Sequence, residues 1–433
     1  MKITRRRYWV FFLLFLFNII AYVDRVNMSV AGKPIAAAFG LSPIALGYLF
    51  SSFFWAYVLT MLPGGRLIDR WGSHRVATLA TAVWSLAQMA TGVAGGFATM
   101  LLSRLSLGMG EAPFAPVTYQ SVRLWAPYGE RGTAIAAISA GASLGPALGA
   151  PIVAWLIEAT SWRWSFIITG AVGFVWVLVW LALVSTPEKT GWLPDAERRH
   201  ILAEREPGPV PAPSEGGGYL ALIRTPAMWG LFISQGCLVY SLYLYLTWLP
   251  NYLQTARHLS LVGSGLFTAL PFLVASFVNV VVNWFGDRLF SLESLRRGRR
   301  RWLVALCLLL TAAGLLVPYV DSLAAVVVLV TFAVSFSNVG PATNAALTGD
   351  LLRSPADAGR AFAFLVLGGN SFGLLAPIVT GYIVAATKSF NSAFFTAGGL
   401  ALFGAVVALA LSRGTIGETP GGARAVAEPR LAD

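Results

Sequence analysis

Apolar runs long enough to cross a membrane recur along the whole chain, and no other feature limits the fold as strictly. A helix needs about 20 such residues to span a hydrocarbon layer about 30 Å thick. We count twelve runs, at 8–31, 43–64, 75–96, 98–123, 131–158, 164–185, 226–254, 262–287, 301–319, 322–348, 357–386 and 391–412. They lack the two-residue alternation of membrane β-strands, so the sequence predicts an all-α integral membrane protein.

Composition and charge agree with this prediction. Hydrophobic residues make up 57% of the chain and charged residues only 12%, which does not describe a soluble surface. The net charge of +12 does not indicate nucleic acid, because the bases gather in alternate loops, at 2–7, 66–75, 123–131, 198–205, 288–301 and 353–360. The positive-inside rule then predicts that both termini are cytoplasmic. The basic start also resembles a signal peptide, but the run is long and we expect a retained anchor helix.

One charged segment, rich in Pro and Gly towards its end, divides the chain. It follows the sixth run and resembles a linker with a short helix at 194–205. The predicted parts are an N-terminal six-helix bundle (1–185), a cytoplasmic linker (186–225), a C-terminal six-helix bundle (226–412) and a disordered tail (413–433). We expect a monomer.

The two halves carry related loops. "GGRLIDRWGSHR" (64–75) follows the second run and "FGDRLF" (285–290) follows the eighth, which indicates the duplicated construction of many transporters. The stretch from Gly65 to Arg75 resembles the loop signature of the major facilitator superfamily. A simple positive-inside loop is the alternative. The predicted conformational residues are Gly65, Asp69, Arg70, Gly72, Arg75, Asp287 and Arg288, with glycines for a tight turn and charges for a network at the helix ends.

Within that superfamily the chain resembles the anion:cation symporter family over nearly its whole length. The resemblance is carried by "YVDRVNMSVA", "FFWAYVLTMLPGG", "SRLSLGMGEAPFAP", "SWRWSFIITG" and "YLTWLPNYL". It implies twelve transmembrane helices in two pseudo-symmetric halves of six. The chain departs from galactonate-type members at Ala142, where they have a glutamine, so we expect a substrate with fewer hydroxyl groups than an aldonate.

Four charged residues fall inside predicted spans. A charge at mid-membrane costs at least about 2.5–3.5 kcal/mol on insertion scales, so each needs a partner or a water-filled cavity. Asp24 and Arg25 are adjacent, point about 100° apart on a helix and therefore need partners on other helices. Arg104 and Glu111 are seven positions apart, on one face but too distant along the axis for direct contact.

These residue types suggest a division of labour. Arginine suits bidentate capture of a carboxylate, whereas buried carboxyl groups can bind and release protons. An anion that neutralises the arginines would make protonation of the acids easier, which is symport in outline. The resemblance implies the same roles, with Asp24 and Glu111 as proton sites and Arg25 and Arg104 at the substrate. A static interhelical charge network is the alternative.

Uncharged residues complete the expected site. Tyr57 occupies the position of a family tyrosine, and Tyr22 lies one turn from the charged pair. From the second half we expect Tyr243 or Trp248, with Asn344 and Asn370 as hydrogen-bonding groups. These side chains are also suited to helix packing, which remains open.

The leading prediction is a proton-coupled importer of a small organic anion (a monocarboxylate, sugar acid or aromatic acid) that works by alternating access in a bacterial inner membrane, as the resemblance implies. An exporter or exchanger would use the same residues, and a non-transporting receptor or scaffold is the alternative from another class. No enzyme is expected, because no nucleophile with a base lies at membrane depth. We expect no cofactor and no metal site, since His74, His200 and His258 are scattered and Cys237 and Cys307 lie in separate runs.

Overall fold

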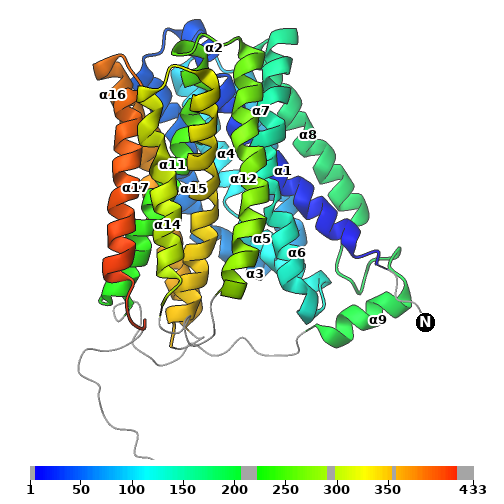
Figure 1. The fold of residues 1–433 in the computed structure, drawn as a ribbon. Helices are drawn as coiled ribbons and strands as arrows, with labels where there is room; N and C mark the ends of the chain where they lie inside the picture. Colours follow the sequence, from blue (N-terminus) through cyan, green and yellow to red (C-terminus); the bar gives the residue numbers. More distant parts are fainter. Residues whose placement is uncertain (1–4, 206–221, 290–297, 354–356, 417–433) are drawn as a thin grey trace, which may run out of the picture.

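Two bundles of upright helices make up the computed structural model, which describes residues 5–205, 222–289, 298–353 and 357–416. The first bundle contains α1 (Tyr8–Val30), α2 (Gly32–Phe39), α3 (Pro43–Gly92), α4 (Phe97–Glu111), α5 (Phe114–Trp125), η1 (Tyr128–Glu130), α6 (Arg131–Ser139), α7 (Gly141–Ala159) and α8 (Trp162–Leu183). The second contains α11 (Pro226–Thr255), α12 (Leu261–Leu289), α14 (Arg301–Thr311), η2 (Ala312–Tyr319), α15 (Leu323–Leu351), α16 (Ala358–Thr387) and α17 (Asn391–Leu411). In Figure 1 the N-terminus lies at the lower end of the molecule and α2 at the upper end.

The predicted all-α fold is confirmed, and a helix occupies each of the twelve predicted runs. Ten helices of the described part are long and apolar enough to cross a membrane. The third and fourth runs do not meet that criterion by themselves. The third is the second arm of α3, which bends at Gly72 (φ 78°, ψ 155°), and the fourth is divided into α4, of 15 residues, and α5.

Breaks within the runs coincide with specific residues. Pro113 separates α4 from α5 directly after Glu111, because proline has no N–H and its ring clashes with the preceding turn. The positive φ of Gly72 is a conformation that residues with a Cβ adopt only with strain. The fifth run is divided at Ala140, between α6 and α7. The break after Glu111 fixes the end of the helix that carries two charged residues.

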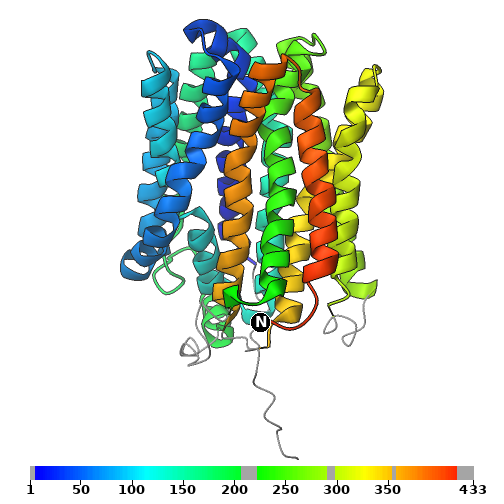
Figure 2. The ribbon, with the colours of Figure 1, turned by 90° about the vertical axis from the view of Figure 1, so that its left-hand side faces the viewer.

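The bundles join at their upper ends, in the region that Figure 2 shows from the side of α16 and α11. The cross-bundle hydrogen bonds there are Ser51 Oγ to Leu374 O (2.7 Å), Ser29 Oγ to Leu246 O (2.6 Å), Lys33 Nζ to Gln254 O (3.2 Å) and the Tyr48–Tyr382 hydroxyl pair (3.1 Å). At the lower end, α1 and α6 lean away from α12 and α15 (Figure 1). These hydrogen bonds hold the two bundles together at their upper ends.

The linker helix α9 (Asp195–Glu204) lies where the sequence predicts a short helix, against the lower end of the first bundle. Arg7 holds it there, with Nη1 donating to Glu197 Oε1 (2.9 Å) and with Nε and Nη2 donating to Glu130 (3.0 and 2.7 Å). Arg7 is only 3% exposed and Glu197 is fully buried. Residues 206–221 of the predicted linker and 417–433 of the predicted tail lie outside the described residues.

The contact between the two bundles at their upper ends, called the upper seam below, includes closely packed glycines. We expect this seam to open when a glycine there is replaced by a residue with a side chain. A Cβ added to Gly47 would lie 2.6 Å from the carbonyl oxygen of Pro377. Gly47→Ala should therefore weaken the upper-closed state, by about 1–3 kcal/mol if it behaves like other overpacked sites. The measurement is the rate at which a thiol reagent modifies Ser51→Cys, a position that is fully buried in the seam.

Gly399→Ala is the matched control, because its added Cβ meets nothing within 4 Å. Equal modification rates in the two alanine variants would contradict this account of the seam.

Candidate substrate and proton site

The four charged residues predicted from the sequence lie on two helices of the first bundle. Asp24 and Arg25 belong to α1, and Arg104 and Glu111 belong to α4. Asp24 and Glu111 are fully buried, and Arg104 is 2% exposed. Such burial is costly for charged groups unless they are paired, so their contacts decide what they can do.

Arg25 forms a buried ion pair with Glu111. Its Nε and Nη2 donate to Glu111 Oε2 at 2.9 and 2.7 Å, and the side chain is 9% exposed. This arrangement confirms that Arg25 finds its partner on another helix. The second carboxylate oxygen of Glu111, Oε1, accepts no hydrogen bond from a described residue.

Aromatic rings surround the Arg25 guanidinium. Its carbon lies 4.6 Å from the centre of the Phe53 ring, 4.7 Å from that of Tyr22 and 5.6 Å from that of Tyr57. Tyr243 reaches the same group from the second bundle, with its hydroxyl 3.4 Å from Nη1. The predicted residues Tyr22, Tyr57 and Tyr243 are thus brought together. Phe53 is not among the residues predicted from the sequence, although it lies one helical turn before Tyr57 on the same face.

Arg104 lacks a comparable partner. Its Nε and Nη1 donate to no acceptor in the described part of the chain. It lies within electrostatic reach of Glu111 and Asp24 but forms no hydrogen bond with either, as the seven-residue spacing predicts for Glu111. Each of these unpaired donors on a buried guanidinium can give a charge-assisted hydrogen bond to a carboxylate.

Asp24 is the most isolated of the four. Neither carboxylate oxygen reaches full hydrogen-bond geometry with a described donor. Arg25, its neighbour in sequence, is turned towards Glu111 instead. A buried carboxylate without donors is expensive to keep charged, so this site favours a group that exchanges protons.

The other residues predicted in the second bundle lie in different surroundings. Trp248 is 2% exposed in the upper seam, where its indole N–H donates to Pro377 O (3.2 Å) and its ring meets that of Phe50 at 5.2 Å. Asn344 is fully buried and its amide donates to Leu231 O (3.0 Å) and Gln235 Oε1 (3.1 Å). Asn370 is half-buried. In this conformation Asn344 bridges helices, the second role that the sequence left open.

The loop signature lies at the lower end of α3. Asp69, Arg70 and Arg75 are exposed there, and neither Asp69 nor Arg70 has an ion-pair partner among the described residues. Gly72 provides the turn, whereas Gly65 is helical, with nothing within 4 Å of an added Cβ. Gly64 is the close-packed glycine, 3.2 Å from Pro113. The side chains of Asp287 and Arg288 lie outside the described residues.

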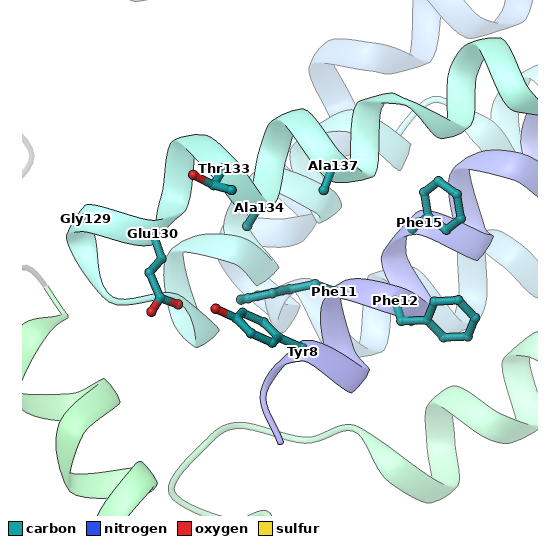
Figure 3. A pocket seen from close by; sticks show the side chains of 9 residues that line it. All are labelled: Tyr8, Phe11, Phe12, Phe15, Gly129, Glu130, Thr133, Ala134 and Ala137. Carbon is teal, nitrogen blue, oxygen red and sulfur yellow. The ribbon is translucent and has the colours of Figure 1, made fainter. Parts of the chain in front are cut away.

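A separate groove lies between the lower ends of α1 and α6 (Figure 3). It encloses about 530 Å³ and contains none of the four charged residues. Its lining is mainly apolar: Tyr8, Phe11, Phe12, Phe15, Gly129, Glu130, Thr133, Ala134 and Ala137. Its one acidic side chain, Glu130, is already paired with Arg7. The groove is therefore distinct from the candidate site. Within the described residues no three His, Cys, Asp or Glu side chains gather as a metal site would require.

Curated relatives extend over nearly the whole chain. The probable galactarate/D-glucarate transporter GudP of Escherichia coli (strain K12) is 30% identical over 95% of this chain and 94% of its own length. The hexuronate transporter of Bacillus subtilis (strain 168) is 31% identical over 95% and 96%. The D-galactonate transporter of Escherichia coli O6:H1 is 34% identical over 68% and 71%. These relatives are named as transporters, the class predicted from the sequence, and not as enzymes.

Solved structures and the family comparison agree on the fold. A bacterial homologue of the lysosomal transporter Spinster superposes with a TM-score of 0.72 at 17% identity, over 94% of this chain and 96% of that one. The D-xylose–proton symporter gives 0.72 at 14% identity, over 95% and 99%. The family model described as Major Facilitator Superfamily matches residues 14–297 and 294–430. The chain therefore belongs to the Major Facilitator Superfamily, as a multi-pass membrane protein.

Proposed function

We propose that this protein is a secondary transporter that moves a small organic carboxylate together with protons. One observation carries the proposal: a buried Arg25–Glu111 pair lies in the same charged cluster as Arg104, whose Nε and Nη1 are unpaired, and Asp24, whose oxygens accept no hydrogen bond. Arg25 and Glu111 neutralise each other, whereas Arg104 and Asp24 each lack a hydrogen-bonded partner. An anion can supply a partner for Arg104, and a proton can neutralise Asp24.

Coupling follows from the contacts of Arg25 and Glu111. A carboxylate that binds the unpaired donors of Arg104 brings a negative charge into a site of low dielectric constant, where the energy of charge interactions is large. The bound carboxylate then competes with Glu111 for the positive charge of Arg25. Once released from Arg25, Glu111 would be a buried acid without a counter-charge, and it would then bind a proton. Asp24 is the second proton site in this scheme.

The chemistry of the relatives supports an organic anion as substrate. Their names specify galactarate, D-glucarate, hexuronate, D-galactonate and, for one 31% identical relative from Cupriavidus necator, sulfoacetate. All of these compounds carry a carboxylate. Ala142 is in the helix α7 and provides no hydrogen-bonding side chain, so smaller and less hydroxylated acids belong in the test set.

The decisive experiment is a flux assay in proteoliposomes. Radiolabelled acids of the classes named above are offered under an imposed inward proton gradient, with and without an ionophore that dissipates it. Accumulation that requires the gradient supports symport. Exchange without any dependence on the gradient would identify an exchanger, and absence of flux for every acid would favour the receptor alternative.

We expect both termini to face the cytoplasm, with the lower end of Figure 1 inside the cell. Ala203→Cys in α9 should then be protected from a membrane-impermeant thiol reagent applied to intact cells, whereas Ala38→Cys in α2 should react. Both alanines are exposed, and the native Cys237 and Cys307 are buried and should add little background. Reaction at Ala203→Cys together with protection at Ala38→Cys would invert the topology.

A further inference from the structure

A further pocket lies at the lower end of the first bundle. It encloses about 550 Å³. Its walls come from the second arm of α3, from the end of α5 and α8, and from the segment that follows α8. None of the four charged residues of the candidate substrate and proton site lines it, and it shares no residue with the groove in Figure 3. The proposed transport scheme does not use this pocket.

The permanently charged side chains of the lining are all basic. Arg75 and Lys189 line the pocket, and its lining contains no Asp or Glu. Both side chains are exposed, and neither forms an ion pair within the part of the chain that the structure describes. Basic side chains at this end of a membrane protein are commonly just solvated. The polar groups between them therefore decide whether the pocket is a site.

The buried polar side chain of the pocket is Ser121 of α5. It is 1% exposed, and its Oγ has no hydrogen-bond partner among the described residues. His74 Nε2, in the wall formed by α3, is a second buried atom of the lining without such a partner. Unpaired buried polar atoms are uncommon and cost free energy, which a bound group can offset. A serine hydroxyl and an imidazole N–H can both donate to an anion.

The backbone of α3 adds donors at the same pocket. The chain leaves helical geometry at Gly72, so the second arm of α3 starts at Ser73, and both residues belong to the lining. The first N–H groups of a helix have no acceptor within that helix, and the helix dipole places partial positive charge there. Phosphate groups commonly bind at such helix starts.

Two tryptophans fix the walls of the pocket. Trp125 Nε1 donates to Ser185 O at 3.2 Å, and Trp180 Nε1 donates to His74 O at 3.4 Å. Each of these tryptophans is 1% exposed. The segment after α8 is thus tied to α5, and the start of the second arm of α3 is tied to α8. Walls that are already in place reduce the ordering cost of binding.

We propose that this pocket is a binding site for a phosphate group, separate from the candidate substrate site. Arg75 and Lys189 supply the positive charge. Ser121, His74 and the start of the second arm of α3 donate hydrogen bonds from different directions, as a tetrahedral oxyanion requires. A volume of about 550 Å³ is in the range of small-molecule sites, so the phosphate can belong to a free compound or to a lipid headgroup. The proposal does not rest on the transport scheme.

Calorimetric titration with inorganic phosphate tests the proposal. The purified protein is kept in a neutral detergent at constant ionic strength, without a transport substrate. The wild type should bind phosphate saturably, and phosphate should raise its Tm, because a ligand of the native state stabilises it by mass action. Ser121→Ala should weaken phosphate binding about tenfold or more, since it removes a hydrogen bond to a charged group. Arg75→Gln combined with Lys189→Gln should abolish measurable binding.

Matched variants separate loss of the site from damage to the fold. Ser335→Ala removes a buried and unpaired hydroxyl of the second bundle, and Arg199→Gln removes an exposed charge of α9. Both should bind phosphate like the wild type. Arg75 and Lys189 are exposed, so their double variant should fold even if Ser121→Ala does not.

Competition by lipids distinguishes the two sources of the phosphate group. Phosphatidylglycerol should displace inorganic phosphate if the pocket takes a lipid headgroup, and should leave the titration unchanged if it takes a free compound. Phosphatidylcholine, whose headgroup has no net charge, is the control. Either result supports a phosphate site and identifies its source. Absence of saturable phosphate binding in the wild type, or wild-type affinity in the Arg75→Gln, Lys189→Gln double variant, would overturn the proposal and leave a pocket filled with water.

Discussion

Replacement of Arg104 by alanine is expected to abolish measurable uptake while the protein still reaches the membrane. Arg104 presents unpaired Nε and Nη1 donors in a nearly fully buried position, where each can give a charge-assisted hydrogen bond to a carboxylate. Lysine should substitute poorly, because a point charge on a flexible stem lacks the planar pair of donors. We expect Arg104→Lys to weaken binding by about 1–3 kcal/mol, or roughly five- to a hundredfold in affinity.

Calorimetric titration with the substrate identified by the flux assay measures this loss. Arg224→Ala is a suitable control, because it removes an exposed arginine at the entrance to α11. It should transport like the wild type. Unchanged affinity in Arg104→Lys, or full uptake by Arg104→Ala, would move the anion site to Arg25 and its aromatic surroundings.

The sequence predicts the fold well because the membrane imposes simple rules. Runs of about 20 apolar residues must be helices, and the charged segment after 185 must lie outside the bilayer. The internal breaks are less predictable. Pro113 and Gly72 are visible in the sequence, but whether a proline ends a helix or only bends it depends on the helices packed around it.

At the site, the spacing of residues within one helix is predictable and the pairing between helices is not. The seven-residue interval correctly separates Arg104 from Glu111, and the adjacency of Asp24 and Arg25 correctly requires partners elsewhere. That Glu111 pairs with Arg25 depends on how α1 and α4 are rotated about their axes, which one sequence does not specify. The same rotation brings Asn27, one turn after Asp24, to hydrogen-bond distance from Thr169.

Whether a residue lines the site or only packs between helices is hard to predict from the sequence. Phe53 lies against Arg25, yet a phenylalanine in an apolar run carries no signal that separates it from lipid-facing neighbours. Asn344 shows the reverse problem. A polar residue in a span suggests a ligand contact, but its amide is used by Leu231 O and Gln235. Only the three-dimensional contacts distinguish a site residue from a helix bridge.

The Glu111→Gln variant is expected to lose proton-driven accumulation and to retain substrate binding. Glutamine imitates the protonated acid and cannot release a proton, so a cycle that depends on protonation of Glu111 can no longer be driven by the gradient. The structure adds a second consequence. Without the charge of Glu111, Arg25 loses its ion pair, so its guanidinium should be available to an anion at every pH. Binding should therefore become less dependent on pH than in the wild type.

Counterflow is the measurement that separates these effects, because exchange of substrate for substrate requires no net movement of protons. Glu111→Gln should support counterflow while failing to accumulate substrate, and Glu158→Gln, at an exposed acid near the end of α7, should do both. If Glu111→Gln still moves protons with substrate at the wild-type rate, Glu111 is not a coupling site. Asp24 would then carry the proton alone, and the Arg25–Glu111 pair would act as the competing counter-charge that an incoming carboxylate must displace.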